Sequence, residues 1–217
     1  MIKDLVDQLH IEGHQVTVLT ASSQIEKKYD IEIMNNIKIL RVRANNQKNL
    51  NYPKRLIFEL FLQRKIWRHY KSNNLPKPDF LIAYSPTIFW SFIIKKIIDR
   101  ERIPVYLILR DIFPKWALDT GIISRFNPVY WFLKWHENRL YNLTNFIGVQ
   151  SESNIKYFSG HKYNTNVETL YNFKKLGSQV PKKVDIRSRF NLGEKVIFVF
   201  GGNLGFAQDP SNLLMLV

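Results

Sequence analysis

Short apolar runs alternate along this chain with segments in which apolar residues recur at helical spacing. The runs are rich in β-branched residues and are bounded by turn-forming residues, which is typical of buried strands. We expect strands at residues 16–20, 37–42, 79–84, 104–109, 145–150, 167–171 and 196–200. We expect helices at residues 2–11, 53–70 and 128–142, and helix starts after Ser85 and Ser151. This alternation indicates βαβ units, so the predicted fold is α/β, with a doubly wound, mainly parallel, Rossmann-like sheet.

Polar residues follow several of the predicted strands. These strand exits are Tyr84-Ser85, Arg110-Asp111, Gln150-Ser151, Tyr171-Asn172 and Gly201–Gly205. Because ligands of doubly wound sheets bind beyond the carboxyl ends of the strands, the exits are candidate binding sites. The alternatives are structural: helix caps at Ser85 and Ser151, a turn residue at Asn172, and at Asp111 a cap of the turn 112–118 with Arg110 as ion-pair partner.

A basic stretch at residues 174–194, with Gly177 and Pro181, divides the chain. We expect it to be a linker between a first domain, residues 1–173, and the start of a second domain, residues 195–217. A doubly wound domain usually opens with a strand and a glycine-bearing turn, whereas this sequence opens with a helical pattern. We therefore expect the first domain to lack its first strand and the second domain to be incomplete.

Composition narrows the possible partners. The absence of cysteine excludes a disulfide scaffold and a thiolate site, and the five histidines show no metal-ligand spacing, so no metal is expected. The net charge is +14, of which a net +10 falls in residues 38–77, and such an excess favours an anionic partner. No apolar stretch reaches the ~20 residues needed to span a bilayer.

The predicted helix at residues 53–70 gathers cations on one side. At ~100° per residue, five cations fall within an arc of about 120°, with two apolar residues among them. This group is Lys54, Arg64, Lys65, Arg68, Lys71, Ile57 and Phe61. Cations mixed with exposed apolar side chains suit an anionic membrane surface, and the alternative is a solvated face on a basic protein. Nucleic acid is not expected, because no RNA-binding signature or helix-turn-helix pattern is present.

The predicted helix at residues 128–142 is rich in aromatic residues. They are Tyr130, Trp131, Phe132, Trp135 and Tyr141. We expect these rings to pack in the core or at an interface, and the alternative is stacking on a sugar.

Three further segments carry a family resemblance. They are residues 11–20, IEGHQVTVLT, residues 109–114, LRDIFP, and residues 200–209, FGGNLGFAQD. The first resembles the "rGHeVtVlT" segment of group 1, family 4-like glycosyltransferases with the GT-B fold. The second and third resemble the "qDlwP" strand exit and the "GNiGxaQd" turn of the subgroup that builds O-antigen, colanic-acid and capsule sugars. Their order and spacing match across nearly the whole chain.

The resemblance implies a retaining glycosyltransferase that moves a hexosyl group from a nucleotide sugar to a lipid-linked saccharide acceptor. The acceptor would be an undecaprenyl-diphosphate-linked sugar used in lipopolysaccharide or other cell-surface polysaccharide synthesis. The implied catalytic residue is Asp111, which would meet the acceptor hydroxyl. The implied acceptor-binding residues are Ser85, Arg110, Gln150 and Asn172, and the donor-binding residues are Gly201, Gly202, Asn203, Gly205 and Gln208.

Further expectations concern cofactors, location and completeness. The resemblance implies no metal or other cofactor, and a cytoplasmic, peripheral location on the inner face of the plasma membrane. Glycines 201–205 would let backbone amides approach the donor diphosphate, and the alternative is a tight βα turn. The family opens with a strand and a glycine-rich loop and carries a donor-binding glutamate pair. Because neither is found here, we expect a chain truncated at both ends and inactive by itself.

Two other interpretations compete with the enzyme. One is a non-catalytic basic module that binds a membrane surface or another anionic ligand. The other is an unstable chain, because a sheet without its first strand would expose an edge.

Overall fold

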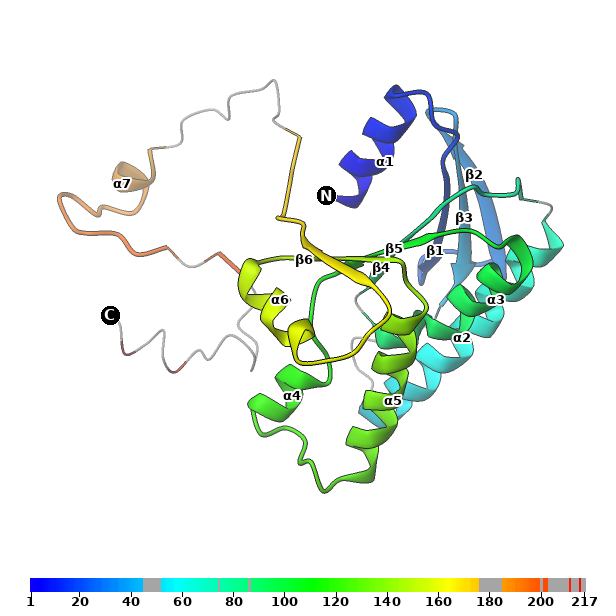
Figure 1. Cartoon of the computed structure of the whole chain (residues 1–217). Coiled ribbons are helices and arrows are strands. Elements are labelled where there is room, and N and C mark those ends of the chain that lie inside the picture. Colours follow the sequence, from blue (N-terminus) through cyan, green and yellow to red (C-terminus); the bar gives the residue numbers. More distant parts are fainter. Residues whose placement is uncertain are drawn as a thin grey trace. The chain divides into compact units, whose positions relative to one another are not determined.

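Two units, Met1–Lys174 and Lys175–Val217, make up the chain in the computed structural model (Figure 1). The structure describes residues 1–44, 52–73, 75–85, 87–175, 185–199, 201–202, 211 and 215. The described part of the second unit contains one short helix, α7 (Ile186–Arg189). Asp185 caps this helix by accepting a hydrogen bond from the backbone N–H of Ser188 at 3.1 Å.

The first unit begins with a helix and a three-stranded sheet. These elements are α1 (Ile2–Ile11), β1 (Thr17–Ser22), β2 (Tyr29–Met34) and β3 (Ile37–Arg43). The strand order is β1-β3-β2, with β1 parallel and β2 antiparallel to β3. Asn35 and Asn36 join β2 to β3 with φ angles of 50° and 63°, which is the conformation that a two-residue hairpin turn requires.

The rest of the first unit is a four-stranded parallel sheet with its helices. The strands are β4 (Leu81–Ser85), β5 (Val105–Leu109), β6 (Phe146–Val149) and β7 (Asn166–Thr169). They lie side by side in chain order, so their carboxyl ends share one edge. The helices are α2 (Tyr52–Ser72), the 3-10 helix η1 (Ile88–Trp90), α3 (Ser91–Glu101), α4 (Lys115–Asp119), α5 (Pro128–Asn142) and α6 (Glu152–Ser159). The predicted α/β, mainly parallel, Rossmann-like architecture is confirmed in this unit.

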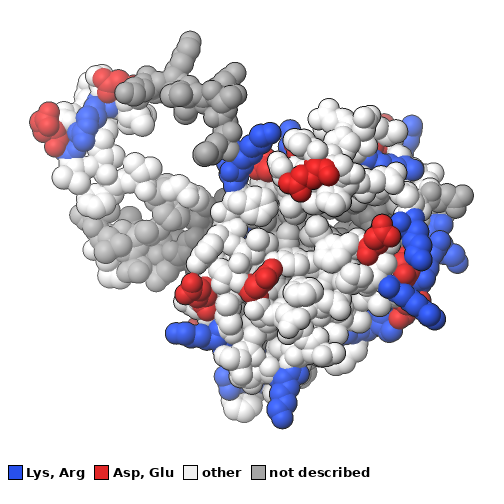
Figure 2. All heavy atoms as spheres, turned by 45° about the horizontal axis from the view of Figure 1, so that its top comes forward, with Lys and Arg blue, Asp and Glu red and all other residues white. Residues whose placement is uncertain are grey.

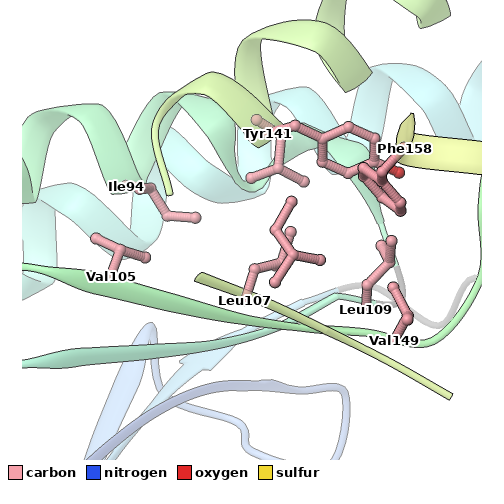
Figure 3. Packing of buried hydrophobic residues seen from close by; sticks show 9 residues of the cluster. Ile94, Val105, Leu107, Leu109, Tyr141, Val149 and Phe158 are labelled. Atoms are coloured by element: carbon pink, nitrogen blue, oxygen red, sulfur yellow. The ribbon is translucent and has the colours of Figure 1, made fainter. Parts of the chain in front are cut away.

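The core of the parallel sheet lies between its strands and three helices (Figure 3). Alternate residues of β5, among them Val105 and Leu107, point to the same face, as the two-residue period of a strand requires. They meet Ile94 of α3, Tyr141 of α5 and Phe158 of α6. All five side chains are buried, so this cluster fixes the helices against the sheet.

A second cluster joins the two sheets. It contains Leu40 of β3, Ile66 of α2 and Ile97 of α3, and Leu81 of β4 packs against it. Among the described residues, β1 and β4 each pair with one strand only, so side-chain packing rather than backbone hydrogen bonding connects the sheets.

One predicted strand is absent from the structure, and two observed elements were not predicted. The described residues 196–199 form no strand, and Val196, Phe198 and Val199 are each at least 74% exposed. A strand needs a partner to satisfy its backbone groups, and the described part of the second unit supplies none. The structure also contains β2 and α4, which the sequence pattern did not predict.

Candidate functional site

Three of the predicted acceptor-binding residues meet at the carboxyl edge of the parallel sheet. Arg110 follows β5, Gln150 follows β6, and Asn172 lies beyond the end of β7. The Gln150 side-chain amide donates a hydrogen bond to the backbone carbonyl of Arg110, and Arg110 Nη1 donates to Asn172 Oδ1. Met1 Sδ lies 3.5 Å from Arg110 Nη1, so the start of α1 reaches the same edge. We call Arg110, Gln150 and Asn172 the strand-exit cluster.

Asp111, the predicted catalytic residue, is exposed beside this cluster. Neither structural alternative for its carboxylate is seen. Within the described ranges Asp111 forms no ion pair with Arg110, whose guanidinium instead hydrogen-bonds Asn172. The N-cap of α4 is Pro114, so Asp111 does not cap that helix. A carboxylate left in this position is able to accept a hydrogen bond from a ligand, and its catalytic role stays a prediction.

Ser85 has a different environment from the cluster. It is 3% exposed, and its hydroxyl donates a hydrogen bond to the backbone carbonyl of Thr87 at 2.9 Å. Thr87, rather than Ser85, caps the next helix by accepting a hydrogen bond from the N–H of Phe89 at 3.3 Å. Ser151 occupies the N-cap of α6 but makes no capping bond with its side chain. The expected cap is therefore wrong at Ser85, whose hydroxyl is engaged within its own turn, whereas Ser151 holds the expected cap position without the side-chain bond.

The predicted donor-binding residues belong to the second unit. Gly201 and Gly202 are described, and both are exposed and outside any helix or strand. Asn203, Gly205 and Gln208 lie outside the described residues. A Cβ at Gly201 would meet nothing within 4 Å, so the described surroundings do not by themselves require glycine there.

The cationic face of α2 is present as predicted. Ile57 is 53% exposed and Phe61 is 59% exposed, while Ile66 and Tyr70 are buried on the opposite side. The Arg64 guanidinium lies 5.5 Å from the centre of the Phe61 ring. Among the cations, Lys54, Arg64, Arg68 and Lys71 are exposed, whereas Lys65 is partly buried and donates to the Arg43 carbonyl at 2.8 Å.

Charge is unevenly distributed over the first unit. On the face shown in Figure 2, lysine and arginine side chains lie mostly along the margin, above all at the right, whereas acidic side chains also lie within the face.

The aromatic residues of α5 divide between two environments. Tyr141 is fully buried, but Trp131 is 62% exposed, Trp135 is 54% exposed and Phe132 is 39% exposed. These three rings do not pack in the core, and the other part of the expectation, packing at an interface, stays a prediction. The helical spacing places positions 131, 132 and 135 on the side opposite Leu133 and Leu140, but both sides are apolar, so the spacing does not decide which side is buried.

Glu137 is a buried carboxylate that the sequence analysis did not single out. It is 0% exposed, and it accepts hydrogen bonds from Lys134 Nζ at 2.5 Å and from the Tyr157 hydroxyl at 2.8 Å. These contacts link α5 to α6. Because both partners neutralise or hydrogen-bond the carboxylate inside the packed layer, its role is structural. The sequence feature that could have indicated a buried carboxylate is the position of Glu137, a single acid on the same side of the helix as Leu133 and Leu140.

No other constellation competes with the strand-exit cluster. In the described part of the chain, no group of three or more His, Asp or Glu side chains could hold a metal ion. No described helix is both long and apolar enough to cross a membrane. The shallow hollow lined by Phe146 and Tyr163 lies near the amino ends of β6 and β7, opposite the strand-exit cluster.

Comparison with known proteins agrees with this architecture. The family model described as Glycosyltransferase Family 4 matches residues 1–173, which is nearly the whole of the first unit. No curated protein matches the chain. The family match supports an enzyme of the glycosyltransferase type, acting in general with a nucleotide-sugar donor and an acceptor. A match over most of the sequence, on a parallel α/β sheet with polar residues at its carboxyl edge, shows that the chain belongs to Glycosyltransferase Family 4.

Proposed function

We propose that this chain forms the acceptor side of a retaining glycosyltransferase. The enzyme would transfer a hexosyl group from a nucleotide sugar to an undecaprenyl-diphosphate-linked saccharide at the inner face of the plasma membrane. The product would be an O-antigen or a related cell-surface polysaccharide. The observation that carries this proposal is the strand-exit cluster, because it gathers polar groups at the edge where sheets of this kind bind ligands.

Asp111 supplies the chemistry in this proposal. Its exposed carboxylate is adjacent to the cluster and accepts a hydrogen bond from the acceptor hydroxyl, which orients that hydroxyl toward the donor sugar. The same negative charge stabilises the positive charge that develops in an oxocarbenium-like transition state. The leaving diphosphate assists the deprotonation, so the reaction requires no metal from this unit. Gly201 and Gly202 begin the donor loop.

The α2 face supports the location. The lipid of the acceptor stays in the bilayer, so the enzyme has to work at the membrane surface. Exposed Ile57 and Phe61 lie among cations, and each cation near an anionic surface contributes about 1 kcal/mol. This face therefore holds the acceptor side of the enzyme where the lipid-linked sugar is available.

The test is sedimentation of the purified chain with anionic vesicles, with and without a polyprenyl-diphosphate-linked sugar. We expect tighter binding to the vesicles that carry the linked sugar. The preference is the ratio of the two affinities. Asp111→Asn and Asn172→Ala should each reduce this ratio by about tenfold, as expected for the loss of one hydrogen bond to a charged or polar ligand group. Asp99→Asn, which removes an exposed carboxylate on α3, is the matched control and should keep the preference.

The opposite result has a definite meaning. Equal binding to both kinds of vesicle, abolished by salt, would contradict an acceptor site on this chain. It would favour the second candidate, a non-catalytic basic module, for which the exposed α2 face is the supporting observation.

A further inference from the structure

An exposed aromatic surface covers the connection between α4 and α5 and the first turns of α5. Its six apolar side chains are each at least 39% exposed, and Phe126 is 97% exposed. We call this set the aromatic surface: Ile122, Phe126, Val129, Trp131, Phe132 and Trp135. Figure 1 shows this segment at the end of the first unit far from α1. A single exposed apolar residue is ordinary, but a run of large apolar side chains in one segment marks an interaction site.

The aromatic surface is held in place by its own contacts. Trp131 Nε1 donates a hydrogen bond to the Arg125 carbonyl at 2.9 Å, which fixes the connection against α5. The rings of Phe132 and Trp135 each lie 4.8 Å from the ring of the buried His136. Two consequences follow. Little conformational freedom remains to be lost on binding, and the indole N–H of Trp131 already has its partner if it leaves water.

The charges around the aromatic surface are positive. Residues 120–136 contain no Asp or Glu, and Arg125 among them is exposed. The next acid, Glu137, is fully buried and paired with Lys134. The Arg139 guanidinium lies 5.2 Å from the centre of the Trp135 ring. An anionic partner is therefore favoured, and a second copy of this surface is disfavoured by the repulsion of like charges.

One core cluster connects α5 to α2. Leu133 of α5 belongs to a small core cluster around η1, and Leu56 and Leu60 of α2 pack against the same cluster. Ile57 and Phe61, each one position later in α2, are exposed. The two helices therefore share one packed cluster, which contacts α5 through Leu133, on the side opposite Trp131 and Trp135.

We propose that the aromatic surface inserts into the headgroup zone of an anionic lipid bilayer and so holds the first unit on the membrane. This inference rests on the membrane association proposed above. It names the residues whose apolar side chains contribute to that association. Tryptophan is enriched at the membrane interface because its ring is apolar and carries a polar edge. Cations next to the rings add attraction to anionic headgroups. Insertion of the rings contributes a component of binding that salt does not screen, whereas attraction between cations and headgroups is screened by salt.

The experiment compares vesicle binding at low salt and at about 0.5 M salt, where surface charges are largely screened. The vesicles contain phosphatidylcholine and phosphatidylglycerol, and a parallel set carries brominated acyl chains that quench nearby tryptophan. The double variant Trp131→Ser/Trp135→Ser removes two rings of the aromatic surface. The double variant Ile11→Ser/Ile33→Ser is the matched control, since these side chains are 66% and 71% exposed on other elements.

We expect the unsubstituted chain to keep measurable binding at high salt and to be quenched by brominated lipid. The tryptophan variant should bind about 30-fold more weakly at high salt, because two half-exposed rings no longer leave water. The control variant should bind like the unsubstituted chain. Phe126→Ser, which changes a 97% exposed side chain and cannot disturb the core, should weaken binding in the same direction.

Several results would overturn the inference. If the tryptophan variant retains full high-salt binding, or if brominated lipid quenches nothing, the aromatic surface does not insert. If binding is abolished by salt and unchanged by the tryptophan substitutions, the α2 proposal stands and this one fails. If no vesicle binds under either condition, both fail. If the tryptophan variant converts a dimer to a monomer without changing vesicle binding, the surface joins two copies of the chain instead.

Discussion

Lowering the pH should destabilise this protein through one buried imidazole, that of His136 on α5. Its side chain is 8% exposed, and the rings of Phe89, Phe132 and Trp135 surround it at 4.8–4.9 Å. Burial, and to a lesser extent the positive charge of Arg139, lowers the pKa of His136 from 6.5 to about 4. The folded protein therefore holds this imidazole in its neutral form through most of the acid range.

The sign and size of the effect follow from this difference. A histidine whose pKa is lower in the folded state takes up its proton more readily in the unfolded state, so protonation favours unfolding. The stabilisation is complete above pH 6.5 and is lost progressively down to pH 4. A difference of about 2.5 in pKa, at about 1.4 kcal/mol for each unit, gives an upper value of about 3.5 kcal/mol. Because two of the rings around the imidazole, Phe132 and Trp135, are themselves 39% and 54% exposed, we expect about half of that value.

The assay is urea unfolding of the unsubstituted chain and of His136→Phe at pH 7, 5.5 and about 4. The difference in the free energy of unfolding between the two proteins should change by about 1–2 kcal/mol across this range, with His136→Phe the less pH-sensitive. His136→Gln provides a second variant in case phenylalanine does not fit among the rings. His14→Gln, which removes an exposed imidazole, is the control. Parallel pH profiles for the unsubstituted chain and both His136 variants would refute this reasoning.

Three further predictions concern stability and can be measured by urea unfolding. Glu137→Ala should lower the free energy of unfolding by about 3–5 kcal/mol, because it leaves a lysine unpaired against the packed layer. Tyr157→Phe should lower it by only about 1 kcal/mol. Equal losses for the two variants would contradict a buried carboxylate paired with the lysine. Gly148→Ala should cost about 1–3 kcal/mol, since its Cβ would lie 2.5 Å from the Tyr106 hydroxyl, and adding Tyr106→Phe should restore part of that loss. Asn127→Ala should cost about 1 kcal/mol, because the Asn127 side chain accepts a hydrogen bond from the first turn of α5 at 2.9 Å, and an unchanged midpoint would count against this cap.

The predicted elements of the first unit agree with the structure where local chemistry specified them. The helix at residues 128–142 has the predicted bounds because Asn127 caps it and Pro128 occupies its first turn. The strand at residues 104–109 is found as β5, one residue shorter. In both places the apolar pattern and the bounding residues indicated the same structure.

The missed elements show where the pattern was insufficient. β2 alternates acidic and apolar residues, and its two-asparagine turn was a hairpin signal, but its side chains are mostly exposed and gave no buried run. The apolar run at residues 196–199 looked like a strand, yet it has no neighbouring strand among the described residues. An apolar run specifies a strand only when a partner is available to pair with it.

The candidate site was predicted residue by residue but not as an arrangement. Arg110, Gln150 and Asn172 were each named because they follow a strand. Only the parallel register of β5, β6 and β7 brings them to one edge, where Arg110 hydrogen-bonds Asn172 instead of pairing with Asp111. The sequence left that choice open, since an arginine next to an aspartate is compatible with either partner.

The sequence by itself determined the alternation of strands and helices, the parallel α/β class of the first unit and the positive charge along α2. These properties depend on the period of apolar residues and on residue identity, both of which are local. Tertiary structure alone decided which side of α5 is buried, and therefore that Trp131 and Trp135 face solvent while Glu137 is enclosed. The reason is that a helix rich in apolar residues offers more than one face for packing, and the neighbouring helices and sheet select which face is buried.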